Sequence, residues 1–266
     1  MSAPSAVDGW GDEHADPALQ VHDVSVAFGG VRALDAVSLS VQAGEVTGLI
    51  GPNGAGKTTL FNVITGLQTP NAGRIVLRGR DITARTPVRR ARMGMARTFQ
   101  RLEVFGSLTA LDNILAAAEF RRGWARDGSD PRRVADDILD RVGLREVAGE
   151  RVDGLPTGLA RLVELGRALA TRPSLLLLDE PGSGLDGTES AALGELLVET
   201  SATGTAVLIV EHDVELVMRI CSTVHVLDFG RLIASGAPSQ VQRDPAVQAA
   251  YLGAEGGSTA TGKGVT

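Results

Sequence analysis

Residues 45–58 read EVTGLIGPNGAGKT, a short apolar run that leads directly into a glycine-rich segment. The segment has the G-x-x-x-x-G-K-T spacing of a phosphate-binding loop, and the helical pattern KTTLFNVITGL (57–67) follows it, as such a loop requires. Glycines let the backbone curl until successive N–H groups point at phosphate oxygens, and the helix N-terminus adds positive potential. The sequence therefore predicts a strand, a phosphate loop and a helix; the alternative is a glycine-rich turn with an incidental lysine.

Lysine usage favours the phosphate loop over the incidental turn. Of the 26 basic residues only Lys57 and Lys263 are lysines, so arginine serves at every other position. Lysine is a compact point charge and arginine a planar fork, so the two are not interchangeable at a phosphate. Lys57 is predicted to reach the β- and γ-phosphates of a nucleotide, and the Thr58 hydroxyl to bind Mg²⁺. The residues expected to hold the phosphates are Gly51, Asn53, Gly54, Gly56, Lys57, Thr58 and Thr59.

The composition is that of a globular protein, with 266 residues of which 43% are hydrophobic and 22% charged. This length suits one α/β domain with an inserted subdomain. The net charge of −6 provides no field for general binding of polyanions, so no nucleic-acid partner is expected. The single cysteine, Cys221, excludes an intrachain disulfide and fits a reducing compartment. Neither a signal peptide in residues 1–17 nor a membrane-spanning apolar run is expected.

Hydrophobic periodicity divides the chain into three parts between polar tails at 1–17 and 254–266, which are expected to be disordered. Alternation near the N-terminus predicts antiparallel strands in LQVHDVSVAF (19–28), VSLSVQ (37–42) and GRIVLRG (73–79). Helical spacing prevails from about 101 to 171 and predicts an inserted helical subdomain. From residue 174 on, apolar strands alternate with helices, which predicts a parallel sheet covered on both faces. The predicted fold class is α/β, with one domain over 18–253.

Polar residues follow the buried strands at the positions where ligands of such sheets bind. The run LLLLDEP (175–181) places Asp179 and Glu180 at a strand end, and His212 follows AVLIVE in the same way. Downstream of a phosphate loop, Asp179 is expected to hold Mg²⁺ through water, and Glu180 to orient or deprotonate the attacking water. Each of these residues, and Gln100 after GMARTF, would alone be an ordinary polar strand end. Their order along the chain is the stronger signal.

From about residue 19 to 252 that order resembles the order of motifs in the ATP-binding cassette ATPases. Phosphate loop, Gln100, a signature segment, the acidic strand, SGLD and His212 follow one another as in that family. The resemblance implies a P-loop ABC cassette with a mixed sheet core, an N-terminal antiparallel β subdomain and an inserted helical subdomain. It also implies ATP and Mg²⁺ as cofactors and ATP hydrolysis as the activity.

The same resemblance assigns roles to individual residues. Glu180, His212 and Gln100 match the catalytic positions, and Gln100 also matches the residue that senses Mg²⁺. Phe28 matches the aromatic that stacks on adenine, for which a ring needs only its π face. Asp186 matches the acid of a loop that crosses the dimer interface.

The signature position carries LPTGL, residues 155–159, where the family usually has LSGGQ. Cassettes of this family form head-to-tail dimers in which each nucleotide lies between one subunit's phosphate loop and the other's signature. Leu155 and Gly158 match, and Gly158 is expected to contact the nucleotide. Pro156 stands where a serine would donate to the γ-phosphate, and proline has neither hydroxyl nor N–H. The altered segment favours a heterodimer, in which a second cassette supplies an intact signature, over a homodimer.

Within the family the chain is most similar to the ATP-binding subunits of branched-chain amino acid importers. The discriminating pieces are ARTFQ (96–100) and AYLG (250–253), and that group often carries proline at the second signature position. The similarity implies transmembrane permease subunits docked beside Gln100, indirectly a solute-binding protein, and a place at the cytoplasmic face of the cell membrane. Two alternatives stay open: a non-transport cassette acting as a regulatory nucleotide clamp, and a lipid-exporting cassette with an ending similar to AYLG.

Overall fold

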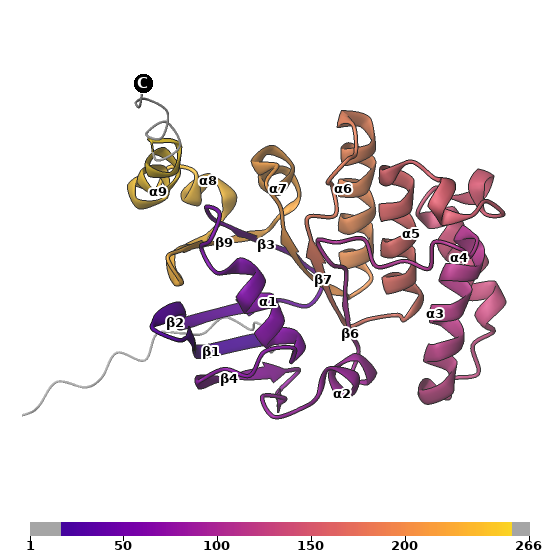
Figure 1. Cartoon of the computed structure of the whole chain (residues 1–266), viewed down its shortest axis with the longest axis horizontal. Helices are drawn as coiled ribbons and strands as arrows, with labels where there is room; N and C mark the ends of the chain where they lie inside the picture. Colours follow the sequence, from indigo (N-terminus) through magenta and orange to yellow (C-terminus); the bar gives the residue numbers. More distant parts are fainter. Residues whose placement is uncertain (1–16, 257–266) are drawn as a thin grey trace, which may run out of the picture.

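The computed structural model describes residues 17–256, which form two sheets flanked by helices (Figure 1). The first sheet is antiparallel, in the order β2-β1-β4-β5. Its strands are β1 (Leu19–Phe28), β2 (Val31–Val41), β4 (Ala72–Leu77) and β5 (Arg80–Asp81). The second sheet has the order β10-β9-β3-β8-β7-β6, in which only β10 is antiparallel to its neighbour. Its strands are β3 (Val46–Ile50), β6 (Met95–Arg97), β7 (Leu175–Asp179), β8 (Ala206–Val210), β9 (Thr223–Asp228) and β10 (Arg231–Gly236).

Three of the helices form a group of their own in space. Figure 1 shows α3, α4 and α5 together at one end of the molecule, away from β1 and β2. The helices are α1 (Lys57–Thr65), α2 (Pro87–Arg92), α3 (Ala110–Ala125), α4 (Pro131–Arg141), α5 (Thr157–Ala170), α6 (Gly187–Ala202), α7 (Val214–Ile220), α8 (Pro238–Val241) and α9 (Pro245–Gly256). Among residues 17–256, none of these helices is both long and apolar enough to cross a bilayer.

Local sequence explains where the central elements begin and end. Every residue of β3, β7 and β8 is buried, as expected for strands covered on both faces, whereas β1 alternates buried and more exposed positions. Helix α1 starts after Gly56 (φ 107°) and ends at Gly66 (φ 81°), two positions where a left-handed backbone favours glycine. Asp186 starts α6 with a capping box, in which its carboxylate accepts from the Glu189 N–H.

The predicted α/β class, with an antiparallel N-terminal sheet and a largely parallel second sheet, is confirmed by these elements. The alternating run 19–28 is β1 in full, and the helices α3 to α5 fall in the stretch where a helical subdomain is expected. Strand β6 and helices α2, α8 and α9 are additional to the elements expected. Helix α9 continues to Gly256, beyond the expected start of the C-terminal tail. The remainder of both predicted tails lies outside the described residues.

Arg90 of α2 is the polar anchor beneath α1, and only 1% of it is exposed. Its Nη1 donates to the carbonyl oxygens of Val63 and Ile64, both at 2.6 Å, and its Nη2 and Nε donate to carbonyls of Thr83 and Arg85. The last carbonyls of a helix have no partner within the helix. Arg90 therefore completes the C-terminal end of the helix that begins at the phosphate loop.

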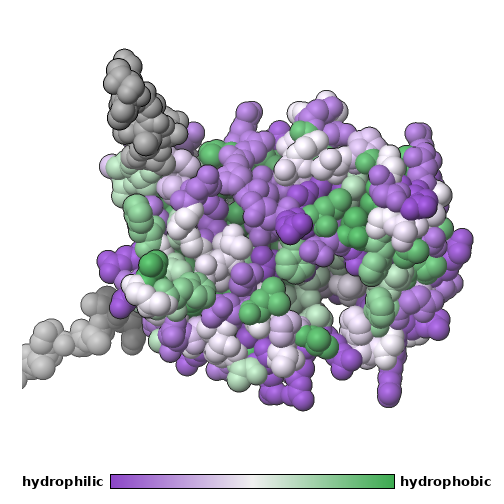
Figure 2. Space-filling view, in the orientation of Figure 1, coloured by the Kyte–Doolittle hydropathy of each residue, from purple (hydrophilic) through white to green (hydrophobic). Residues whose placement is uncertain are grey.

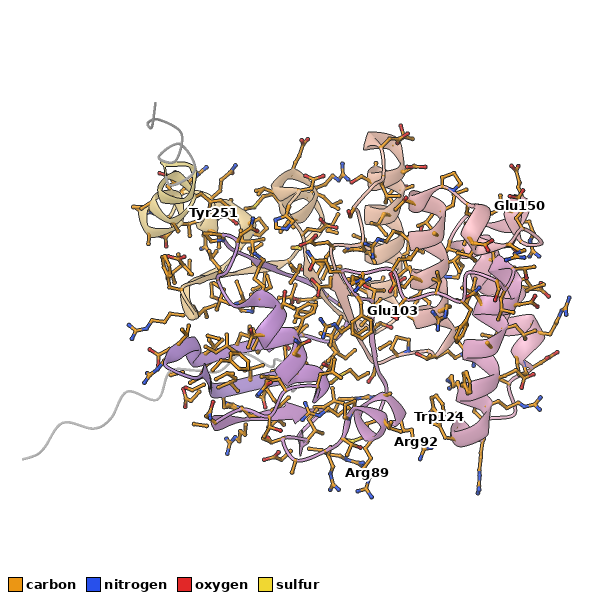
Figure 3. The ribbon with its side chains drawn as sticks, viewed as in Figure 1. Arg89, Arg92, Glu103, Trp124, Glu150 and Tyr251 are labelled. Carbon is orange, nitrogen blue, oxygen red and sulfur yellow. The ribbon has the colours of Figure 1, made fainter. Side chains whose placement is uncertain are left out.

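Replacing Arg90 with methionine should lower the free energy of unfolding by about 2–4 kcal/mol, because several buried carbonyls lose a charged donor. Urea unfolding followed by circular dichroism measures the change. Arg89→Met is the matched control, since Arg89 is exposed and points away from the protein in Figure 3. That control should stay within about 0.5 kcal/mol of the parent. Equal losses in the two variants would contradict the anchoring role of Arg90.

Candidate nucleotide-binding site

The loop from Gly51 to Gly56 joins β3 to α1 along a path that only glycine follows easily. Gly51, Gly54 and Gly56 have φ angles of 149°, 78° and 107°. Two of them are also confined by neighbours: an added Cβ would lie 2.0 Å from the Leu227 carbonyl oxygen at Gly51 and 2.7 Å from the Ala33 carbonyl oxygen at Gly56. The glycines of this motif are therefore required by the path of the loop, as a backbone cradle for phosphate demands.

Lys57 begins α1 and turns its ammonium group back over the loop. Nζ donates to the carbonyl oxygens of Gly51, at 2.5 Å, and Pro52, at 3.0 Å. Burial lowers the pKa of Lys57, and the charges of Glu180 and Asp179 oppose that shift. A hydrogen bond from an ammonium to an anionic phosphate oxygen is stronger than one to a neutral carbonyl, so the exchange of one for the other is favourable. Lys57 is thus placed to bind a phosphate at the mouth of the loop.

Glu180 stands at the centre of the polar groups that follow the strands. Its Oε1 lies 2.6 Å from His212 Nε2, and Gln100 Nε2 lies 3.3 Å from both carboxylate oxygens. The backbone of Glu180 has φ 53°, and its N–H donates to the Val210 carbonyl at 2.8 Å. A non-glycine residue in this left-handed region is strained, and such strain concentrates at functional sites. The three predicted catalytic side chains therefore meet, although they lie in the segments that follow three different strands, β6, β7 and β8.

One pocket of about 310 Å³ joins the phosphate loop to these strand ends. Ten predicted site residues line it: Asn53, Gly54, Gly56, Lys57, Thr58, Thr59, Gln100, Asp179, Glu180 and His212. Gly51 lies behind the lining and takes part through its carbonyl oxygen, which accepts from Lys57.

The predicted magnesium ligands Thr58, Gln100 and Asp179 all line this pocket. Within residues 17–256 there is no cluster of three or more His, Cys, Asp or Glu side chains that could hold a metal unaided. Mg²⁺ commonly takes one or two protein groups together with phosphate oxygens and water, so the donor set fits that ion. Burial raises the pKa of Asp179, and the hydrogen bond from Arg97 opposes the shift.

Three further predicted residues lie away from the pocket. Phe28 ends β1 and is 51% exposed, and Ala33 of β2 is the residue from this sheet that lines the pocket. The Asp186 carboxylate accepts from the N–H groups of Thr188 and Glu189 and so starts α6. Gly158 packs against the same region, because an added Cβ would lie 2.9 Å from Leu185 Cδ2. Their expected contacts with a nucleotide stay predictions.

The sequence profile of the ABC transporter family matches residues 34–183. This chain belongs to the ABC transporter family. A second profile, for branched-chain amino acid ATP-binding cassette transporters, matches residues 231–257 of the cassette. Among solved structures, a nucleotide-free ATP-binding cassette from an ABC transporter is 32% identical, with a TM-score of 0.80 over 88% of this chain and 98% of that one. A cassette in its ADP conformation is 31% identical, with a TM-score of 0.78 over 90% of this chain and 100% of that one.

Three curated relatives of the cassette come from two kinds of transport system. The high-affinity branched-chain amino acid transport ATP-binding protein LivG of Salmonella typhimurium is 37% identical over 252 residues, 90% of this chain and 99% of the relative. BraF of Pseudomonas aeruginosa, with the same description, is 37% identical over 250 residues, 89% and 98% of the two chains. The lipopolysaccharide export ATP-binding protein LptB of Haemophilus influenzae is 32% identical over 235 residues, 88% and 97%. The predicted membership of the cassette family is confirmed.

The signature segment of the cassette leads directly into α5. Pro156 precedes the first helical residue, Thr157, and its carbonyl accepts from the Ala160 N–H at 3.0 Å. No side chain among the described residues caps this helix end. Pro156 is the residue before the helix, where its missing N–H costs the helix nothing.

Two charged residues of the cassette were not singled out from the sequence. Arg97 of β6 pairs with Asp179, with 2.9 Å between Nη2 and Oδ2. Glu211, at the end of β8, accepts from the Gly182 N–H at 2.6 Å and so holds the segment after Glu180; burial raises its pKa. The available signal was a charge attached to an apolar run, since ARTF and AVLIVE each carry one.

Side chains on one face of helix α5 form hydrogen bonds with the backbone of the segment around Gln100. Glu164 Oε1 accepts from the N–H groups of Phe99 and Glu103, both at 3.2 Å. Arg161 donates to the Phe99 carbonyl at 2.8 Å and to the Gln100 carbonyl. Arg167, two turns along, donates to the Glu103 carbonyl. The helix that carries the signature therefore positions the backbone of the glutamine that contacts Glu180.

Glu164→Ala should loosen that segment without reaching the phosphate loop, because the N–H groups of Phe99 and Glu103 lose their acceptor. Hydrogen exchange measured by mass spectrometry should show faster exchange at these two amides, while the amides of α1 keep their protection. Glu119→Ala is the control, since Glu119 lies on α3 with an exposed side chain. Unchanged exchange at Phe99 and Glu103 in Glu164→Ala would contradict the assigned contacts.

Proposed function

We propose that this chain is the ATP-hydrolysing subunit of a branched-chain amino acid transporter. It works at the cytoplasmic face of the cell membrane with transmembrane permease subunits and, indirectly, with a solute-binding protein. The observation that carries the proposal is the convergence of Lys57, Glu180 and His212 on one pocket, in a chain whose residues 231–257 match the branched-chain cassette profile. LivG and BraF, matched over nearly their whole length, support the same assignment.

Each group of the pocket has a distinct task in this proposal. The loop N–H groups and Lys57 bind the β- and γ-phosphates, and Thr58 and Asp179 hold Mg²⁺, which when bound neutralises charge on the phosphates. Glu180 orients the attacking water and accepts its proton. His212 and Gln100 restrict the Glu180 carboxylate to one orientation, since both lie within 3.3 Å of it. Positioning and charge stabilisation are the main demands of phosphoryl transfer.

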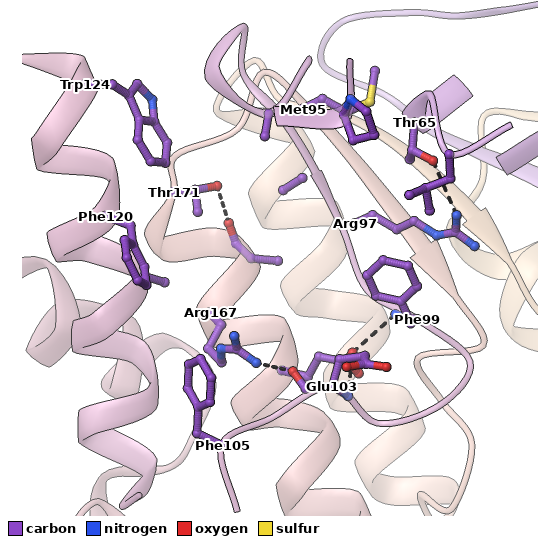
Figure 4. A pocket seen from close by; sticks show the side chains of 17 residues that line it. Thr65, Met95, Arg97, Phe99, Glu103, Phe105, Phe120, Trp124, Arg167 and Thr171 are labelled. Carbon is purple, nitrogen blue, oxygen red and sulfur yellow. Dashed lines mark hydrogen bonds between the residues drawn. The ribbon is translucent and has the colours of Figure 1, made fainter. Parts of the chain in front are cut away.

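A groove beside Gln100 provides a surface for the permease subunits. It encloses about 470 Å³ between α2, β6, α3 and α5, and Figure 2 shows apolar residues beside a hollow on this face. In Figure 4, Phe120 and Trp124 of α3 lie on one side of it, and Arg97 and Phe99 lie on the other. Phe120 is 67% exposed, and a large apolar side chain at a concave surface is typical of an interaction site. We assign this groove to a permease segment with apolar side chains.

The signature segment supports a heterodimer with a second ABC ATPase. Pro156 offers no hydroxyl to the nucleotide of a neighbouring cassette, whereas Lys57, Thr58 and Glu180 are all present in this chain's own pocket. In the heterodimer, the second cassette's intact signature completes the pocket described here. The site completed by Pro156 closes less firmly, by the roughly 1.5–3 kcal/mol of one charged hydrogen bond.

A lipid-exporting cassette is the second candidate function. LptB of Haemophilus influenzae, matched over 88% of this chain, is the observation that favours it. The match of residues 231–257 to the branched-chain cassette profile supports the amino acid transporter instead.

Glu180→Gln should lower ATP turnover by about 10²–10⁴-fold, because the amide keeps the shape of the carboxylate and cannot accept a proton. The affinity for ATP should change little, since the phosphate-binding groups remain. Phosphate release gives the turnover, and equilibrium dialysis gives the affinity. Glu195→Gln, an exposed change on α6, is the control. Normal turnover in Glu180→Gln would refute the proposed base, and the absence of ATP binding by the unaltered chain would refute the proposed function.

The heterodimer proposal predicts slow turnover by this chain alone. Pro156→Ser should then raise its turnover about tenfold or more, because the new hydroxyl restores one charged hydrogen bond across a homodimer. Pro156→Ala is the control, since it restores the N–H without the hydroxyl and should give a smaller gain. Fast turnover by the unaltered chain in isolation would count against the need for a second cassette.

A further inference from the structure

Arg97 lies between the two elements that carry the proposed magnesium ligands. Its Nη1 donates to Asn62 Oδ1 on α1 at 2.7 Å, and its Nη2 donates to Asp179 Oδ2 at the end of β7 at 2.9 Å. Asn62 lies four residues after Thr58, and residues at this spacing share one face of a helix. A single guanidinium thus spans the gap between the helix of Thr58 and the strand of Asp179.

The guanidinium of Arg97 is fixed by its surroundings. It lies over the Phe61 ring, at 5.4 Å from the centroid, and over the Phe99 ring, at 4.7 Å. The side chains of Arg97 and Asp179 are only 6% and 4% exposed. Figure 4 shows Arg97 and Phe99 next to each other at one end of the groove. A planar, stacked guanidinium loses little freedom when it binds, so it sets distances more sharply than lysine could.

The two carboxylate oxygens of Asp179 have different environments because of Arg97. It binds Oδ2, while no hydrogen bond within residues 17–256 reaches Oδ1. The Asp179 N–H donates to Thr98 Oγ1 at 3.3 Å, which fixes the backbone beneath the carboxylate. Oδ1 therefore remains as the oxygen available to a cation or to its bound water.

We propose that Arg97 is a positioning residue for the magnesium ion. It sets the separation between the Thr58 hydroxyl and the Asp179 carboxylate, and it reserves Oδ1 for the coordination shell of the ion. The inference rests on the magnesium site of the proposed function and adds the residue that organises it.

Two effects of Arg97 on a divalent cation oppose each other. Its positive charge repels the cation, while its hydrogen bonds orient the carboxylate that binds it. The repulsion acts from the Oδ2 side of the carboxylate, because Arg97 binds that oxygen at 2.9 Å and leaves Oδ1 for the cation. Loss of a partner that orients a metal ligand typically weakens metal affinity by about 10–100-fold. The orientation effect therefore decides the sign, and removal of Arg97 weakens binding.

The test measures Mn²⁺ binding to the full chain in the presence of ADP, by electron paramagnetic resonance. Arg97→Met should weaken Mn²⁺ binding by about 10–100-fold, while ADP binding measured in EDTA stays unchanged. Arg97→Lys keeps the positive charge but loses the two-pronged guanidinium. Its Mn²⁺ affinity should lie between those of the unaltered chain and Arg97→Met. Asn62→Ala releases one end of the guanidinium and should weaken Mn²⁺ binding in the same direction, and this variant decides the question if Arg97→Met does not fold.

A matched control separates positioning from stability. Arg90→Met also removes a buried arginine, so it should lower the melting temperature and leave Mn²⁺ binding in place. Folded Arg97→Met or Asn62→Ala proteins that bind Mn²⁺ as tightly as the unaltered chain, or more tightly, would overturn the role of Arg97. Failure of the unaltered chain to bind Mn²⁺ together with ADP would instead overturn the proposed magnesium site and the function that depends on it.

Discussion

The parallel pairing of β3, β8, β7 and β6 is the constraint on which the site depends. Parallel strands end at the same edge of a sheet, so the loops that follow them meet there. The register aligns Asp179 of β7 with Val210 of β8, which places Glu180 beside the residues that follow β8. The Glu180 N–H then donates to the Val210 carbonyl, and its carboxylate meets His212, 32 residues further on. Small displacements between these strands would separate the groups that are proposed to act on one phosphate.

This edge of the sheet lowers the stability of the fold, because charged side chains are buried there and lose their hydration. Arg97 and Asp179 form one almost fully buried pair, and Arg161 and Glu164 form another nearby. Buried pairs of this kind are often no more stable than apolar groups of the same size, since desolvation offsets their attraction. These ion pairs fix the orientation of the backbone, because each pair binds a segment that continues into the nucleotide pocket. The fold thereby exchanges some stability for fixed distances between the groups of the candidate site.

The sequence predicts the parts of the site whose signal is local. The phosphate loop is readable because its glycines and lysine lie within eight residues, and the acidic strand because Asp179 and Glu180 follow four leucines. Contacts between residues that are 65 or 82 positions apart are different, since Glu164 meets Phe99, and Arg97 meets Asp179, only once β6 has paired with β7. Short elements such as β6 carry too little periodicity to show that pairing in advance.

The signature segment, which a neighbouring cassette would contact, can be considered separately from this chain's own pocket. Pro156 removes one donor, but α5 still begins at Thr157, and the first N–H groups of a helix remain free to face an anion. Gly158 packs against Leu185 so closely that an added Cβ would lie 2.9 Å from its Cδ2. Under the proposed function, Pro156 therefore removes one hydrogen bond and leaves the helix start in place. In the proposed heterodimer, a weakened second site would still let two unequal cassettes close together while one of them hydrolyses faster, which a lost site would not.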